Sequence, residues 1–99
     1  MFIVTLRFSH NRGLAAQHMD AHKAWIRRGV EDGVFLLVGS LQPNSGGAII
    51  AHNISLPSLR ERVAQDPFVI EGIVATEILE VAPSLTDARL AFLKAEAPA

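Results

Sequence analysis

The feature that most constrains the fold of this chain is an apolar segment near its centre, Val34 to Leu41, with the sequence VFLLVGSL. It lacks polar alternation, so the pattern predicts a strand covered on both faces, with Phe35 and Leu37 on one side and Leu36 and Val38 on the other. The chain has 99 residues, enough for one domain with a modest core. Exposed apolar surface of several hundred Å² normally marks an interface, so we expect two copies to pack sheet to sheet as a homodimer.

The composition excludes several classes of function. Lys plus Arg number 9 against 10 Asp plus Glu, a net charge of -1, which gives no basic surface for nucleic acid. Without Cys there is no disulfide, no Cys-based metal site and no thiol nucleophile. No apolar run approaches the roughly 18 residues of a membrane span, and the start lacks the basic and long apolar regions of a secretory signal. We therefore expect a cytoplasmic protein.

In the first third of the chain the spacing of apolar residues changes from that of a strand to that of a helix. Phe2 to Phe8 alternates, with Ile3, Thr5 and Arg7 on the second face, which predicts a half-buried strand. From about Leu14 to Asp32 the spacing becomes helical, and Gly33 provides a stop. The predicted apolar face of this helix consists of Ala15, Met19, His22 and Ile26, with Trp25 and Val30 beside it.

The rest of the chain predicts a hairpin, two helices and a strand. The turn-forming sequence QPNSGG joins the central strand to an apolar strand at Ala48 to His52. Ser55 is a helix cap, and this helix should end near Asp66-Pro67, because a residue before proline avoids the helical conformation. Ile73 to Val81 predicts a fourth strand. Ser84 with Asp87 resembles a capping box that opens a last helix, Leu85 to about Glu96.

This order of elements predicts an α+β protein of the ferredoxin-like βαββαβ type: a four-stranded antiparallel sheet with helices on one face, plus a C-terminal helix. In that topology one edge collects the ends of strands one and two, the first half of helix one and the end of helix two. The residues at that edge are Arg7, His18, His22, Ser40 and Asp66. A His and an Asp that meet beside a cation and a hydroxyl would form a small-molecule site.

Three segments, AHKAWIRRGVEDGVFLLVGSLQP, GGAIIAH and DPFVIEGIV followed by TEILE, resemble the YCII-related (YciI-like) proteins. The resemblance covers about residues 1 to 82, leaving residues 83 to 99 as a C-terminal helical extension. Its most specific parts are His22 to Trp25 and Asp66-Pro67-Phe68. It implies a dimeric ferredoxin-like α+β barrel with a His and Asp pair, proposed for the family as acid and base, at His22 and Asp66. Many members have Pro where this chain has Ser40.

Each candidate site residue also has a structural interpretation. His22 lies on an apolar helix face, as a hydrogen-bonded core histidine would, and Asp66 suits the N-cap of the turn that Pro67 begins. Arg7 either binds a substrate carboxylate or enolate or pairs with Glu77 on the fourth strand. Ser40 either donates to a substrate oxygen or belongs to a turn.

A metal site would need more ligands than one helix supplies. His18 and His22 are four residues apart, but two imidazoles are an incomplete set, and His10 or Asp66 would have to join them. We therefore expect no metal and no cofactor.

Two function classes remain. The first is a cofactor-independent lyase or isomerase in which His22 moves a proton of a small organic substrate and Asp66 orients the imidazole. The second is a non-catalytic dimer that binds a small metabolite or serves as an interaction module. A titratable pair at the rim favours the enzyme.

Overall fold

The computed structural model of the chain describes residues 1–96. Its strands are β1 (Phe2–Phe8), β2 (Phe35–Leu41), β3 (Gly46–Ala51) and β4 (Val74–Glu80). Its α-helices are α1 (Ala15–Glu31), α2 (Leu56–Ala64), α3 (Pro67–Ile70) and α4 (Phe92–Glu96), and two short 3-10 helices are η1 (Arg12–Leu14) and η2 (Ala88–Leu90). No helix within residues 1–96 is both long and apolar enough to cross a lipid bilayer.

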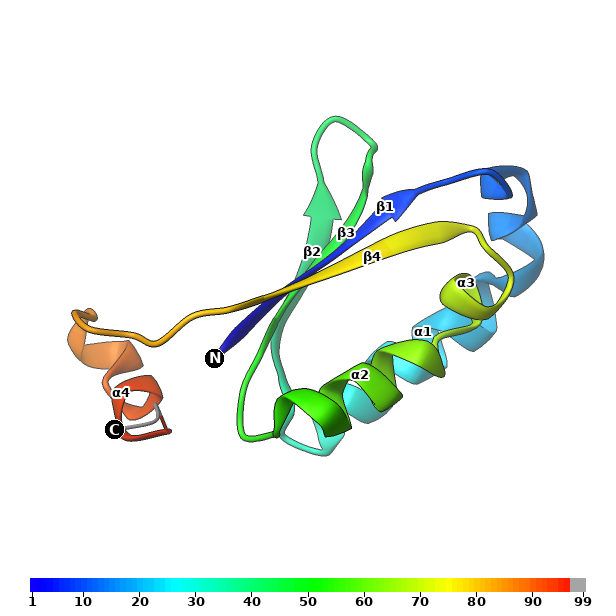
Figure 1. The fold of residues 1–99 in the computed structure, drawn as a ribbon. Coiled ribbons are helices and arrows are strands. Elements are labelled where there is room, and N and C mark those ends of the chain that lie inside the picture. Colours follow the sequence, from blue (N-terminus) through cyan, green and yellow to red (C-terminus); the bar gives the residue numbers. More distant parts are fainter. Residues whose placement is uncertain (97–99) are drawn as a thin grey trace.

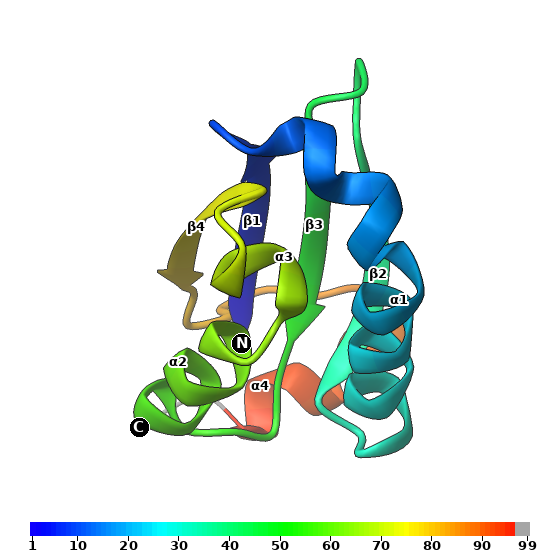
Figure 2. The same cartoon turned by 90° about the vertical axis from the view of Figure 1, so that its right-hand side faces the viewer.

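The four strands form one sheet in the order β2-β3-β1-β4, and every neighbouring pair is antiparallel. Helices α1, α2 and α3 cover one face of this sheet (Figures 1 and 2). This arrangement confirms the predicted ferredoxin-like α+β fold. We call the face that carries the helices the helix face and the opposite one the open face.

The ends of the helices follow from local chemistry. Gly33 has a φ of 73°, in the left-handed region that glycine adopts without strain, and it follows the C-cap of α1. The hydroxyl of Ser55 accepts a hydrogen bond from the backbone N–H of Ser58 at 3.3 Å, which caps α2 as expected. The backbone N–H of Asp66 donates to the carbonyl of Val63 at the end of α2, and its carboxylate caps α3 through the N–H of Phe68.

The core lies between the helices and the helix face. Alternation along β1 sends Phe2, Val4 and Leu6 into this layer, where Val4 lies opposite Ile49 of β3. Trp25 from α1 joins them and is fully buried, and its indole N–H donates to the carbonyl of Arg62 at 3.0 Å. That hydrogen bond satisfies the one polar atom of the largest core side chain and ties α1 to α2.

Strand β2 differs from simple alternation. Its pairing with β3 shifts between Phe35 and Leu37, and this β-bulge accommodates Leu36 as an additional residue. As a result Phe35 and Val38 share the helix face, whereas Leu37 lies on the open face. The prediction that Phe35 and Leu37 share a side is therefore wrong, although both faces of the strand are apolar as predicted.

Residues 81–96, which follow β4, lie on the side of the sheet opposite to α1 and α2 (Figure 1). A C-terminal helix is present as predicted, but its predicted start at Leu85 is wrong: η2 begins at Ala88, and α4 spans only Phe92–Glu96. Asp87 is extended, with a ψ of 151°, and its carboxylate caps η2 through the N–H of Arg89, so no helix runs through it. The Arg89 side chain, followed by this N–H, holds the pKa of Asp87 below its usual value.

Candidate functional site

A cavity of about 320 Å³ lies between the first half of α1 and the helix face of the sheet. Its size is at the lower end of small-molecule sites. From α1 it is lined by Met19, His22, Lys23 and Ile26, which recur at the spacing of one helix face. From the sheet and α3 it is lined by Leu6, Phe8, Val38, Gly39, Ser40, Gly46, Gly47, Ala48, Ile49, Phe68 and Val74.

The contact between α1 and the sheet differs between the two halves of the helix. At its C-terminal half, Gly29 is so near Phe35 that an added Cβ would lie 2.1 Å from the phenyl ring. At the other half the sheet presents Gly47 and Ser40, which face each other in the β2–β3 pairing and leave room above them. Small residues at one end and a close helix approach at the other therefore produce the space.

His22 and Asp66 meet at the edge of this cavity. Nδ1 of His22 lies 2.7 Å from Oδ1 of Asp66, although the two residues are separated by 44 positions in the chain. The side chain of Asp66 is fully buried and that of His22 is 12% exposed. With a carboxylate on Asp66, Nδ1 carries the proton and donates it, which leaves Nε2 as the ring nitrogen available to a ligand.

The carboxylate of Asp66 also caps the N-terminus of α3. Its Oδ1 also accepts from the backbone N–H of Phe68 at 3.0 Å, so one oxygen caps α3 and binds the imidazole. Oδ2 is buried and has no hydrogen-bond partner among the residues that the structure describes. The two interpretations of Asp66 from the sequence thus coexist in a single side chain.

Aromatic rings fix the plane of the imidazole. The ring of Phe68 is stacked on that of His22, with centroids 3.8 Å apart and an angle of 4° between the planes. Trp25 lies further away at 6.0 Å and 22°. A ring that is hydrogen-bonded at one nitrogen and stacked on one face keeps a single orientation, which is what an acid/base catalyst requires.

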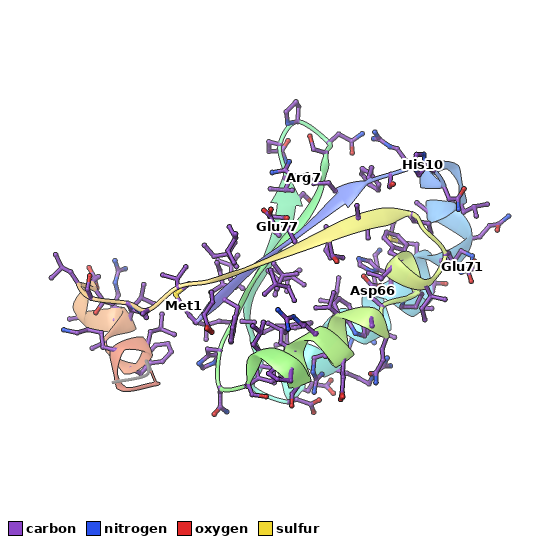
Figure 3. All side chains as sticks on the ribbon, in the orientation of Figure 1. Met1, Arg7, His10, Asp66, Glu71 and Glu77 are labelled. Atoms are coloured by element: carbon purple, nitrogen blue, oxygen red, sulfur yellow. The ribbon has the colours of Figure 1, made fainter. Side chains whose placement is uncertain are left out.

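The other residues expected at this edge are divided between the two faces of the sheet. Ser40 lines the cavity with His22. Arg7 does not line it, because alternation puts its side chain with Ile3 and Thr5 on the open face. Figure 3 shows Arg7 and Glu77 on the side of the sheet away from Asp66. The alternative for Arg7, an ion pair with Glu77, is not formed among the described residues, although the two are diagonal neighbours on the open face of β1 and β4.

Lys23 lines the cavity and was not expected from the sequence. The available signal was its spacing, four residues after Met19 and three before Ile26 on the same helix face. His18, one turn before His22, does not line the cavity. Within residues 1–96, no group of three or more His, Asp or Glu side chains comes close enough together to hold a metal ion.

Comparisons with known proteins agree with this architecture. Residues 1–82 match the YCII-related domain. No functionally curated protein is similar enough in sequence to count as a match. A similar solved structure is the 5-chloro-2-hydroxyhydroquinone dehydrochlorinase TftG from Burkholderia phenoliruptrix AC1100 in complex with 2,5-dihydroxybenzoquinone. The two superpose with a TM-score of 0.66 and 17% sequence identity, over 82% of this chain and 93% of the other. This similarity identifies the fold that the chains share.

Proposed function

The chain belongs to the YCII-related family, and from that premise we propose a cofactor-independent enzyme of the lyase or isomerase type that acts on a small organic substrate. In this proposal His22 and Asp66 are a general acid/base pair. The observation that carries it is the 2.7 Å contact between Nδ1 of His22 and Oδ1 of Asp66 at the wall of a mostly apolar cavity. That contact leaves Nε2 to exchange a proton with a ligand.

The reaction begins with removal of a proton from a carbon next to a carbonyl or on an activated ring. Nε2 of His22 takes the proton, and the electron pair of the C–H bond forms a new double bond in the substrate. The resulting imidazolium is stabilised by the carboxylate of Asp66 at the other nitrogen. In a lyase a leaving group departs with its bonding electrons and the imidazolium returns its proton to solvent or to that group. In an isomerase the proton returns to a different carbon.

The solved structure that shares the fold supports this class of reaction. Its name describes a dehydrochlorinase, an enzyme that removes hydrogen chloride, and its ligand is a dihydroxybenzoquinone. Removal of hydrogen chloride is an elimination that needs a base and no redox partner. Hydroxylated quinones and quinols are therefore the first compounds to test with this chain.

We also propose that the protein is a homodimer joined through the open face. Leu37 and Leu79 lie on that face with 58% and 46% of their surface exposed in the single chain. Isolated apolar residues are common on surfaces, but a group of them on a sheet face favours an interface. A stable interface of this kind buries more than about 1,000 Å² in total.

Proton exchange tests the proposed chemistry before the full reaction is known. The protein is incubated in D₂O with a panel of hydroxyquinones, hydroxyhydroquinones and small keto acids, selected first by thermal shift. Loss of each C–H signal is followed by ¹H NMR. We expect accelerated exchange with at least one compound, reduced about 10² to 10⁴-fold by His22→Ala. His18→Ala is the matched control, because it removes a histidine from the same helix without touching the cavity.

The exchange rate of the His22→Ala variant can also refute the proposal. If compounds stabilise the protein but His22→Ala leaves their exchange rate at the wild-type value, the acid/base role of His22 is refuted. Stabilisation without exchange in any compound would favour the alternative, a non-catalytic dimer that binds a small metabolite.

A further inference from the structure

The wall of the cavity includes one basic side chain other than His22, that of Lys23. The other lining residues within the described part of the chain are apolar or small, apart from His22 and Ser40. No Asp or Glu belongs to the lining. Asp66 lies behind the imidazole, fully buried, with its Oδ1 already bound to His22 and to the backbone of Phe68. The cavity therefore offers a ligand positive charge and no exposed negative charge.

Nothing within residues 1–96 neutralises the Lys23 ammonium. The described ion pairs join His22 to Asp66, Arg62 to Asp32, and Arg89 to Asp87, and none of them includes Lys23. Lys23 is exposed, and lysines on a solvated helix surface commonly lack a partner, but its neighbours at both adjacent turns, Met19 and Ile26, line the same cavity. A cation beside an apolar wall attracts an anion more strongly than a fully hydrated one does.

A second cation, Arg12, lies beside a residue of the cavity wall. The guanidinium carbon of Arg12 is 4.2 Å from the centre of the Phe8 ring, and Phe8 is part of the cavity wall. Nη2 of Arg12 also donates to the carbonyl of Asn44 at 3.1 Å, which fixes the guanidinium next to the β2–β3 turn. Positive potential thus comes from α1 and from η1, and it favours entry of an anion.

From this geometry we propose that the substrate is an anion and that Lys23 is the residue that selects it, by binding a carboxylate on a small planar molecule. The planar class follows from the aromatic side chains of Phe8 and Phe68 in the wall and from the cavity volume of about 320 Å³. The proposal rests on the proposed function, since the bound carboxylate would orient the substrate toward His22. Ser40, at the opposite wall, supplies a neutral hydroxyl for a second oxygen.

The test compares two probes of the same shape. ¹⁵N-labelled protein is titrated with 4-hydroxybenzoate and with 4-hydroxybenzamide, in which a neutral amide of the same shape replaces the carboxylate, and chemical shifts of the cavity residues give each Kd. We expect the wild type to bind the acid about tenfold more tightly than the amide. Lys23→Met should abolish this preference, and Lys23→Arg should keep it.

Arg27→Met is the matched control. It removes a cation from the exposed surface of α1, one turn after Lys23, outside the cavity lining. We expect it to leave the preference for the acid unchanged, which separates a local contact from the loss of net charge. If the two probes bind equally to the wild type, or if Lys23→Met leaves the preference intact, the proposal is wrong.

Failure of this inference differs from failure of the proposed function. If the protein binds the acid more tightly than the amide through Lys23, but no compound shows proton exchange, Lys23 remains the anion site and His22 has no catalytic role. If proton exchange depends on His22 while Lys23→Met keeps the wild-type KM, the catalytic role of His22 stands and Lys23 is not the anion site.

Discussion

The imidazole of His22 lies flat on the phenyl ring of Phe68, with the ring centroids 3.8 Å apart and the planes within 4° of each other. Phe68 also donates its backbone N–H to the same Asp66 oxygen that contacts His22. The short helix α3 therefore positions the imidazole twice, once through the carboxylate at its N-cap and once through the first aromatic ring of the helix.

Replacement of Phe68 by Leu separates these two effects. Phe68→Leu keeps the backbone N–H and the cap, but it removes the stacked ring. We expect a loss of about 1 to 2 kcal/mol in the free energy of unfolding and a lower kcat on any substrate, with the His22 to Asp66 contact retained. Urea unfolding and steady-state kinetics measure the two quantities. An unchanged kcat per folded molecule would show that stacking contributes to packing only.

His22 and Asp66 should behave as one unit in kinetics. His22→Ala should lower the rate about 10² to 10⁴-fold. Asp66→Asn should also reduce the rate severely, because an amide can hold the imidazole in the wrong tautomer. We expect the double variant to be scarcely slower than the slower single variant, since residues that act together are not additive.

The melting temperature is the control for this pair. Asp66 is fully buried and caps α3, so Asp66→Asn should lower the melting temperature as well as the rate. Rates are therefore compared per folded molecule, from circular dichroism at the assay temperature. Losses that multiply in the double variant would argue for independent roles. If His22→Ala lowers the melting temperature but leaves the rate per folded molecule unchanged, His22 is a core residue and not a catalytic one.

The topology could be predicted from the sequence because each transition has a local signal. Gly33 ends α1, Ser55 caps α2, and the Asp66-Pro67 pair stops the chain from continuing as one helix. Once the βαββαβ order is fixed, the middle of α1 and the end of α2 must approach each other. The proximity of His22 and Asp66 is a consequence of that order.

The remaining details depend on pairing that the sequence does not specify. The bulge at Leu36 arises only when β2 pairs with β3, so the faces of Phe35 and Leu37 could not be read from alternation. Arg7 is a different case. Strand alternation with Ile3 and Thr5 indicates the open face for Arg7, even though Arg7 lies near the sheet edge that carries the candidate site.

Close packing of α1 against β2 gives a prediction about stability. An added Cβ on Gly29 would lie 2.1 Å from the ring of buried Phe35, so Gly29→Ala should cost about 1 to 3 kcal/mol and lower Tm by at least about 4 °C. Gly13→Ala is the control, because a Cβ there meets no atom within 4 Å. If both variants melt at the same temperature, the approach of helix and strand is looser than described.

Metal content remains a prediction from the sequence. His18 and His22 supply two imidazoles on one helix, whereas structural metal sites usually have four ligands. We expect elemental analysis of protein purified without chelator to find no stoichiometric transition metal. One zinc, nickel or iron ion per chain would contradict this and would make His18 and His22 candidate ligands, to be tested by whether His18→Ala removes the metal.

The open face gives the last prediction, which concerns assembly. Leu37 is on the open face, so Leu37→Lys would place a charge within the proposed interface, where leaving it unpaired is costly. We expect sedimentation at micromolar concentration to show a dimer for the wild type and a 10.7 kDa monomer for this variant. Val30→Lys is the matched control, because Val30 is similarly exposed on α1, far from the open face, and should leave the dimer intact. A wild type that sediments as a monomer would refute the proposed dimer, and a Leu37→Lys variant that still sediments as a dimer would move the interface to another surface.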